Sequence, residues 1–189
     1  KDYKDRGKKF KEFVLKLKWM PIYKTKNENF FKKWAPEMAY VLGFFTADGN
    51  MIKNKKGAHF IEFQSIDKEI INKIRNCLKS NLVIGEYQPK NKNHSRRYRL
   101  QIGSKKIFND LSKLGMIPNK SLILKLPKIP DKYFNHFVRG YFDGDGNVTI
   151  STYKRANRNN SESITILSGF TSGSKKLLEK LHMKLKKIA

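Results

Sequence analysis

Two aspartates in matching surroundings are the strongest candidates for chemistry in this 189-residue chain. Asp48 ends the segment Val41-Leu-Gly-Phe-Phe-Thr-Ala-Asp48, and 97 residues later Asp145 ends Val138-Arg-Gly-Tyr-Phe-Asp-Gly-Asp145; both are followed by Gly-Asn. Carboxylate oxygens bind hard divalent cations, and Mg²⁺ typically takes one or two carboxylates together with water and phosphate oxygens. Such a metal can promote phosphodiester hydrolysis, because it activates the attacking water and stabilises the leaving oxygen.

Small residues on the preceding segments predict how the two aspartates meet. Gly43 and Ala47 are four residues apart, as are Gly140 and Gly144, and residues with that spacing share one face of a helix. Stripes of small residues let two helix backbones approach closely. We therefore expect two helices to pack stripe against stripe and to bring their terminal aspartates together. Mutual repulsion and the helix C-terminal dipoles make that arrangement costly without a cation.

Two simpler interpretations compete for these residues. A single Asp-Gly pair is a common turn signal at a helix end, and for one copy that interpretation would prevail. Two copies on matching stripes favour a shared site instead. Asp143-Gly-Asp-Gly-Asn147 also begins like an EF-hand calcium loop, but Val148 stands where the loop needs glycine and Lys154 where it needs glutamate. The calcium-loop interpretation is therefore rejected.

The elements that would position the aspartates occur in a repeated order, which predicts an α+β protein with an internal repeat of about 95 residues. The second copy stops after one strand pair and one helix, about 40 residues short of the first, so it is either truncated or naturally reduced. We divide the chain into a basic N-terminal extension (1–35), a first half (36–129) and an incomplete second half (130–189). The extension is expected to form a basic amphipathic helix and an irregular linker. The expected elements are helices at 36–48, 67–78, 104–115, 130–145 and from 174, and strands at 58–65, 82–88, 96–103, 148–153 and 162–170.

The composition indicates a folded protein with a polyanionic partner. Lysine and arginine number 41 against 16 acidic residues, a formal net charge of +25. A disordered basic tail would lack the 39% hydrophobic residues of this chain. The longest apolar run, 38–47, is too short to cross a membrane, and the single Cys77 excludes a disulfide framework and a cysteine-based zinc site. We expect a soluble intracellular monomer, in a bacterial or archaeal cytoplasm or an organelle.

Alternating strands predict a surface that contacts nucleic acid. In the strand 97–102, arginine or glutamine at odd positions alternates with tyrosine, leucine or isoleucine at even positions. This pattern is typical of a sheet with one face on a core and the other on solvent or a ligand. A two-stranded ribbon fits the major groove of DNA, and lysines and arginines in flanking loops (53–56, 90–92, Arg155 and Arg158) suit phosphates. The candidate DNA-binding residues are Lys53, Lys55, Glu62, Gln64, Arg97, Arg99, Gln101, Thr149, Ser151, Arg155, Ser163 and Thr165.

The paired segments ending at Asp48 and Asp145 resemble the double signature of the LAGLIDADG homing endonucleases, in their single-chain, two-motif form. The resemblance runs from Pro36 to the end of the chain. It implies a saddle of two pseudo-symmetric αββαββα halves, with the signature helices at the interface and a DNA-cutting site at their base. It also implies that Asp48 and Asp145 bind the catalytic metal, Mg²⁺ or another divalent ion, and that Lys120 is a basic residue near it. A solvated loop lysine is an equally good interpretation of Lys120.

Three functions follow from this resemblance. The leading one is a sequence-specific endonuclease, of the intron-encoded homing type, that cuts double-stranded DNA at a long pseudo-symmetric target. The second is an RNA-binding splicing cofactor, or maturase, with intron RNA as its partner. The third is a DNA-binding regulator that keeps the fold without cleavage, and retention of both Asp48 and Asp145 argues against it.

Overall fold

The computed structural model describes residues 23–89, 95–119, 122–155 and 161–188. The predicted helix of the N-terminal extension, the catalytic candidate Lys120, and the basic loop residues at 90–92 and Arg158 lie outside the described residues. Within them, no helix has the length and apolar character needed to cross a membrane.

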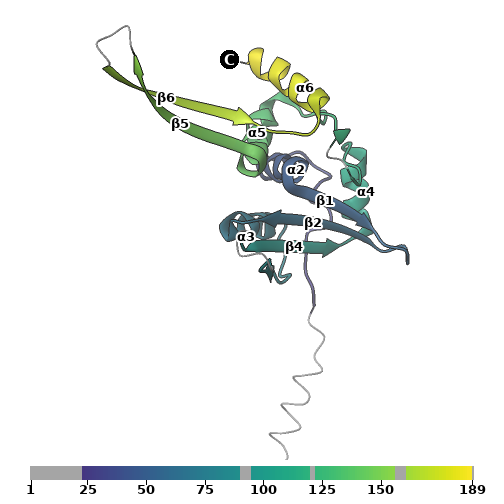
Figure 1. Ribbon diagram of the computed structural model, residues 1–189. Helices are drawn as coiled ribbons and strands as arrows, with labels where there is room; N and C mark the ends of the chain where they lie inside the picture. The colour runs from purple at the N-terminus through teal and green to yellow at the C-terminus, as the bar shows by residue number, and fades with distance from the viewer. Residues whose placement is uncertain (1–22, 90–94, 120–121, 156–160, 189) are drawn as a thin grey trace, which may run out of the picture.

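Two packed helices occupy the centre of the molecule (Figure 1). The first, α2 (Pro36–Asp48), starts with a proline, which has no N–H to leave unpaired in the first turn. It is buried on all sides from Met38 to Thr46 because it is hydrophobic around its whole circumference. The second, α5 (Asp131–Asp145), buries only the stripe containing Phe134, Phe137, Gly140 and Tyr141. Both helices end at the aspartates predicted from the sequence.

The first half carries a four-stranded antiparallel sheet in the order β1-β2-β4-β3. Helices α3 and α4 contact β2, and α3 also contacts β4, so one face of the sheet is buried. Each helix begins at a capping residue: Asp67 accepts a hydrogen bond from the backbone N–H of Glu69 (2.7 Å), and Ser104 accepts one from that of Ile107 (3.2 Å). The strand β3 is shorter than expected. The bounds are β1 (Gly49–Lys53), β2 (His59–Ser65), α3 (Lys68–Cys77), β3 (Gly85–Tyr87), β4 (Arg97–Gly103) and α4 (Lys105–Lys113), and the buried apolar residues on the helix-covered face are Met51, Ile61, Phe63, Leu100 and Ile102.

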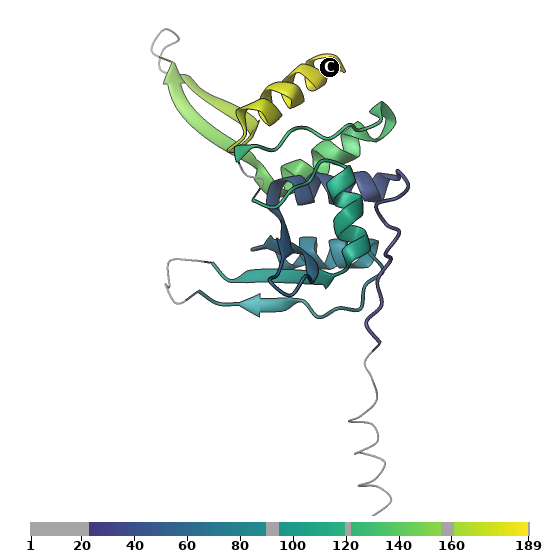
Figure 2. The same ribbon diagram turned by 90° about the vertical axis from the view of Figure 1, so that its right-hand side faces the viewer.

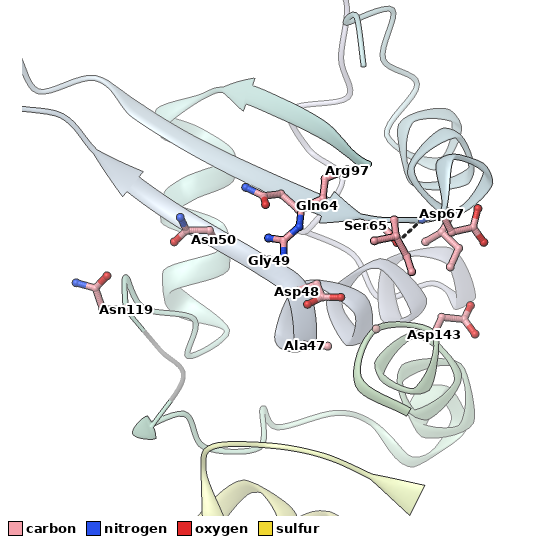
Figure 3. Close-up of a pocket in the computed structure, with 13 residues that line it drawn as sticks. Ala47, Asp48, Gly49, Asn50, Gln64, Ser65, Asp67, Arg97, Asn119 and Asp143 are labelled. Carbon is pink, nitrogen blue, oxygen red and sulfur yellow. Dashed lines mark hydrogen bonds between the residues drawn. The ribbon is translucent and has the colours of Figure 1, made fainter. Parts of the chain in front are cut away.

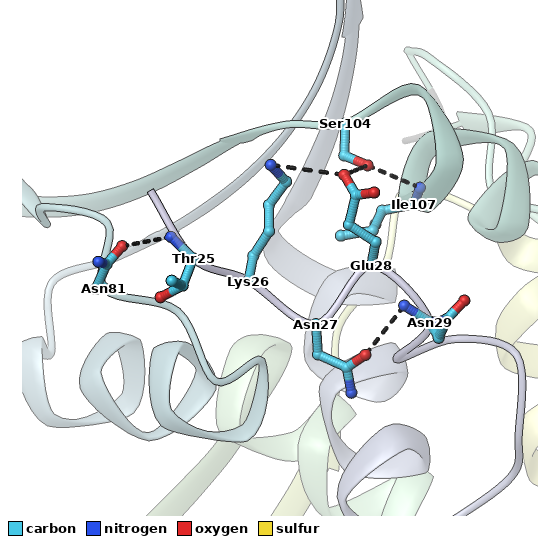
Figure 4. A network of polar contacts seen from close by, with 8 residues as sticks. All are labelled: Thr25, Lys26, Asn27, Glu28, Asn29, Asn81, Ser104 and Ile107. Carbon is cyan, nitrogen blue, oxygen red and sulfur yellow. Dashed lines mark hydrogen bonds and ion pairs between the residues drawn. The ribbon is translucent and has the colours of Figure 1, made fainter. Parts of the chain in front are cut away.

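The segment 23–28, which precedes α2, forms hydrogen bonds with two separate parts of the first half (Figure 4). The side-chain amide of Asn81 accepts a hydrogen bond from the N–H of Thr25 (2.8 Å) and donates one to the carbonyl of Tyr23 (2.7 Å). Farther along, Glu28 accepts a hydrogen bond from the hydroxyl of Ser104 (3.0 Å), and this bond lowers the pKa of Glu28. The segment therefore connects the end of α3 to the start of α4.

After α5, the second half has two strands and one further helix among the described residues. Strands β5 (Gly146–Arg155) and β6 (Ser161–Phe170) pair in register, with Ile150 opposite Ile166, and α6 (Lys175–Lys186) follows. The strand pair extends away from the body of the protein, and the two sheets lie on opposite sides of the central helices (Figures 1 and 2).

One face of the β5–β6 pair is apolar and is not covered by any of the described residues. Ile164 is 71% exposed and Ile166 is 67% exposed, and Val148 and Ile150 on the same face are also exposed. The corresponding face of the first sheet is buried beneath α3 and α4. Within residues 122–155 and 161–188, the structure contains no further strands and no counterpart of α4 to cover this face.

A matched pair of substitutions tests this difference. Ile61→Ala should lower the free energy of unfolding by about 2–5 kcal/mol, because it leaves a cavity in the covered face. Ile166→Ala should change it by about 0.5 kcal/mol or less, because that side chain already contacts water. Chemical denaturation measures both values. Equal losses would mean that the second face is covered in solution.

Candidate functional site

Close backbone contact between α2 and α5 determines the geometry of the site. A Cβ atom built on Gly43 would collide with the carbonyl oxygen of Phe137, and one built on Gly140 would collide with that of Tyr40. The two collisions are equivalent, because each pair of positions differs by the 97 residues that separate the two motifs. The helices are thus related by a pseudo-two-fold axis, and the predicted packing of the small-residue stripes is confirmed.

The stripe ends beside the two aspartates. A Cβ on Gly144 would lie 2.5 Å from the Cβ of Ala47 and 3.6 Å from Oδ2 of Asp48, so the end of α5 touches the end of α2. Burial raises the pKa of Tyr141, and the negative charges of Asp145 and Asp48 raise it further. The structure brings Asp48 and Asp145 to one place, with Asp48 exposed and Asp145 half-buried.

The glycines after the aspartates do not form the turn that the competing interpretation of Asp-Gly requires. Gly49 has φ −82° and ψ 151°, and Gly146 has φ −79° and ψ 153°, which is extended backbone. Each helix therefore passes directly into a strand, and Lys53, predicted in a loop, is the last residue of β1. Glycine is needed for another reason: a Cβ would collide with the ring of Phe45 in one half and of Phe142 in the other. The interpretation of Asp-Gly as a simple helix-ending turn is wrong.

A cavity of about 680 Å³ opens beside Asp48 (Figure 3). Gln64 from β2 and Arg97 from β4 extend over the sheet above the end of α2, and Asn119 lies on the opposite side. Asn119 has φ 53°, a left-handed conformation that asparagine tolerates. The lining residues are Ala47, Asp48, Gly49, Asn50, Gln64, Ser65, Ile66, Asp67, Ile70, Arg97, Asn119, Asp143 and Gly144.

The donor atoms at the site fit a hard divalent cation. Asp48 and Asp145 offer carboxylate oxygens, which Mg²⁺ and similar ions prefer. Across the described ranges, no cluster of three or more histidine, cysteine, aspartate or glutamate side chains is placed to hold a metal. Two carboxylates alone leave most of the coordination shell to water and to a ligand, as is usual for Mg²⁺.

Two residues before the terminal aspartate, the second half has Asp143 and the first half has Thr46. The contacts of these two side chains explain the difference. Asp143 accepts a 2.6 Å hydrogen bond from the hydroxyl of the buried Tyr40, and Lys73 lies 4.0 Å from the same carboxylate. Burial and this hydrogen bond raise the pKa of Tyr40. At the symmetry-related positions, Phe137 has no hydroxyl and Thr46 bonds to the carbonyl of Leu42 (2.7 Å). Asp143 thus accepts a hydrogen bond from the buried hydroxyl of Tyr40, at a position where the other half has phenylalanine.

The candidate DNA-binding residues fall into two groups on the two sheets. In the first half, Glu62, Gln64, Arg97, Arg99 and Gln101 share the sheet face away from the core, together with Asn50; we call these six residues the polar face. In the second half, Thr149, Ser151, Ser163 and Thr165 share one face of β5–β6, and Arg155 ends β5. Lys53 and Lys55 are exposed at the end of β1 and in the turn after it.

Sequence analysis did not identify Tyr40, Tyr141, Asn50 or Asn119 as residues of the site. The repeat could have indicated Asn50, because an asparagine follows the Asp-Gly pair in both copies of the motif. The two tyrosines lie on the helices that carry the motif, but nothing in the local pattern indicates which atoms they contact. Asn119, which immediately precedes Lys120 in the sequence, lines the cavity.

Comparisons with known proteins agree with this architecture. Residues 35–114 match the family model of the LAGLIDADG-like domain. The meganuclease I-SmaMI bound to uncleavable DNA is similar in fold, with a TM-score of 0.52 and 16% identity over 79% of this chain and 71% of that one. At this identity the likeness shows the fold alone.

Two proteins of Methanocaldococcus jannaschii are similar in sequence. An uncharacterized protein is 31% identical over 117 residues, which are 61% of this chain and 40% of that protein. The DNA-directed RNA polymerase subunit Rpo1C is 32% identical over 114 residues, which are 59% of this chain and 13% of that protein. The chain therefore spans less than half the length of either relative.

The close helix contact predicts a large loss of stability. Gly43→Leu or Gly140→Leu should reduce the free energy of unfolding by about 3 kcal/mol or more, because the new side chain meets backbone that cannot move aside. Gly85→Leu is the control, since a Cβ there would meet only the carbonyl of Arg99 at 3.7 Å. Thermal melting of the three variants decides the point. Parent-like melting of both helix variants would contradict the packing.

Proposed function

Because the chain carries a LAGLIDADG-like domain and has the fold of a meganuclease, we propose that it is a sequence-specific endonuclease that hydrolyses double-stranded DNA with a divalent metal, of the intron-encoded homing type. The observation that carries this proposal is the meeting of Asp48 and Asp145 at the ends of α2 and α5. A protein that only bound DNA would gain nothing from two adjacent carboxylates facing phosphates, which they repel.

The charge and shape of the molecule support DNA as the partner. The net charge of +25 favours a polyanion, and each sheet starts directly after one of the two aspartates and carries polar side chains on one face. The first sheet presents six polar side chains and the second presents mainly hydroxyls. Exposed lysines such as Lys53 and Lys55 suit phosphate contacts, which position a protein on DNA without reading its sequence.

The residues around the aspartates suit phosphodiester hydrolysis. Asp48 and Asp145 would hold the metal, for which Mg²⁺ is the first candidate; when bound, it supplies an activated water and neutralises charge on the phosphate. The Arg97 guanidinium, at the cavity wall, can donate two hydrogen bonds to phosphate oxygens. The Asn119 amide, on the opposite side, can orient a water molecule. In the reaction a water oxygen bonds to phosphorus, and the bond from phosphorus to one bridging oxygen breaks.

Substitution of the aspartates tests the proposed chemistry. Asp48→Asn or Asp145→Asn should abolish cleavage while changing DNA affinity by less than about tenfold, because metal binding is lost but phosphate contacts remain. Glu179→Gln is the control, since it makes the same charge change on the exposed surface of α6. Cleavage with Mg²⁺ is measured on a duplex recovered by binding selection from a randomised pool.

Three outcomes of this experiment are informative. Loss of cleavage in both aspartate variants, with activity in the control, supports the proposal. Full activity in the aspartate variants would place the chemistry elsewhere. A parent protein that binds DNA selectively but never cleaves it would favour the regulator, and selective binding of RNA would favour the splicing cofactor.

The unequal sheets predict unequal contacts with the two half-sites. The first half offers four strands to DNA, but residues 122–155 and 161–188 of the second half contain only the two strands β5 and β6. The 189-residue chain should therefore protect the half-site under the first sheet more strongly than the other. Footprinting on the selected duplex measures this difference. Equal protection of both half-sites would show that two strands suffice for a complete contact.

A further inference from the structure

A carboxylate lies buried in the middle of the polar face, where a DNA-binding surface would ordinarily avoid negative charge. Glu62 stands on β2 opposite Gln101 of β4 and opposite Asn50 of β1. It is only 4% exposed, although it is on the sheet face that points away from the core. A buried carboxylate is costly unless neighbouring groups donate hydrogen bonds to it.

Three neighbours on the polar face bind this carboxylate. Gln64 donates from Nε2 to Oε1 of Glu62, and Gln101 donates from Nε2 to Oε2 at 3.2 Å. The Arg99 guanidinium forms an ion pair with the same Oε2 through Nη1, at 3.6 Å. Each of the three was predicted from the sequence as a separate DNA contact, yet they converge on one carboxylate.

The chemistry of the carboxylate determines how these neighbours are oriented. A carboxylate can only accept hydrogen bonds, so both glutamine amides must direct Nε2 toward Glu62. Each amide is then left with its carbonyl oxygen and its second N–H for other partners. Arg99 uses one edge of its guanidinium on Glu62, and its side chain is still 54% exposed. The remaining donors and acceptors are therefore fixed in direction before any ligand arrives.

These fixed groups match particular base edges. An amide that presents one oxygen and one N–H complements N6 and N7 of adenine, and a guanidinium edge complements O6 and N7 of guanine. Side chains already held in place lose less rotational freedom on binding than free ones. We propose that Glu62 is a positioning residue that orders Gln64, Gln101 and Arg99 to select a contiguous block of two adenines and one guanine.

The second sheet has no carboxylate at the position equivalent to Glu62. Gly169 stands opposite Asn147 just as Glu62 stands opposite Asn50, so glycine occupies the position of the carboxylate. A Cβ on Gly169 would meet only the exposed side chain of Asn147, 2.9 Å from its Oδ1, so the second sheet has no acidic side chain at this position to order its neighbours. The selectivity for the block should therefore belong to the first half-site alone.

The proposal rests on the DNA binding of the proposed function and not on cleavage, so it is tested by binding. The full chain carrying Asp48→Asn, with or without Glu62→Gln, is used to select duplexes from a randomised pool. Glutamine can donate as well as accept, so it no longer fixes the neighbouring amides. Glu86→Gln is the matched control: it removes the same charge from the same sheet, on β3 and on the opposite face from Arg99.

The expected result is a loss of selectivity without a loss of affinity. The parent should select the block, and Glu62→Gln should reduce discrimination against wrong bases there by about tenfold. Its affinity for unselected DNA should hold or rise, because a negative charge has gone from the surface. Glu86→Gln should keep the preferences of the parent. A residue that only stabilised the fold would lower both affinities together.

Other results of the selection would contradict either the positioning role of Glu62 or the proposed function. If Glu62→Gln keeps the preferences of the parent, or if the selected block lacks the adenines and guanine, the ordering role is wrong. If the parent selects no sequence at all, the proposed sequence-specific function is wrong instead. Should Glu62→Gln fail to fold by thermal melting, Gln101→Met replaces it: loss of one adenine preference supports the role, and an unchanged block overturns it.

Discussion

The contact between α2 and α5 is the constraint on which the rest of the structure depends. The helix backbones meet at Gly43 and Gly140, where no Cβ atom could be accommodated. That approach brings Asp48 and Asp145 to one point, although their charges repel each other and each lies at the negative end of a helix dipole. Helix packing thus imposes a carboxylate pair that electrostatics alone would separate, and such a pair suits a divalent cation.

The same contact makes the molecule pseudo-symmetric, and its departures from symmetry have physical causes. Tyr40 carries a buried hydroxyl and requires Asp143 as acceptor, whereas its counterpart Phe137 has none and is matched by Thr46. The four-stranded sheet buries one face beneath helices, but the β5–β6 pair leaves isoleucines exposed. Two halves that share one interface therefore differ in the surface that each offers to a partner.

The positive charge of the whole molecule and the single negative charge of Glu62 in the polar face have different effects on binding. The large excess of lysine and arginine supplies attraction to a polyanion that does not depend on its sequence. Selectivity needs donors and acceptors with fixed directions, and in the polar face a single buried carboxylate provides that order for Gln64, Gln101 and Arg99. Glu62 would weaken a surface that needed only charge, which is why its burial among these side chains favours a role in selectivity.

Local patterns in the sequence were sufficient to predict the helix interface, the fold class and the faces of the strands. The spacing of Gly43 with Ala47 and of Gly140 with Gly144 predicted the helix interface, because residues four apart share a helix face. The repeated motif predicted the α+β fold, which is confirmed, and the LAGLIDADG resemblance, which agrees with the family-model match over residues 35–114. The alternation of polar and apolar residues predicted which strand residues share a face of each sheet.

Only the tertiary structure decided which side chains meet. Tyr40 and Asp143 are 103 residues apart, and Glu62 and Gln101 are 39 apart, so no local period relates them. Strand alternation placed Glu62 and Arg99 on a solvent face but could not reveal that they bind each other. Periodicity fixes the face on which a residue lies, and packing between distant segments fixes its partner.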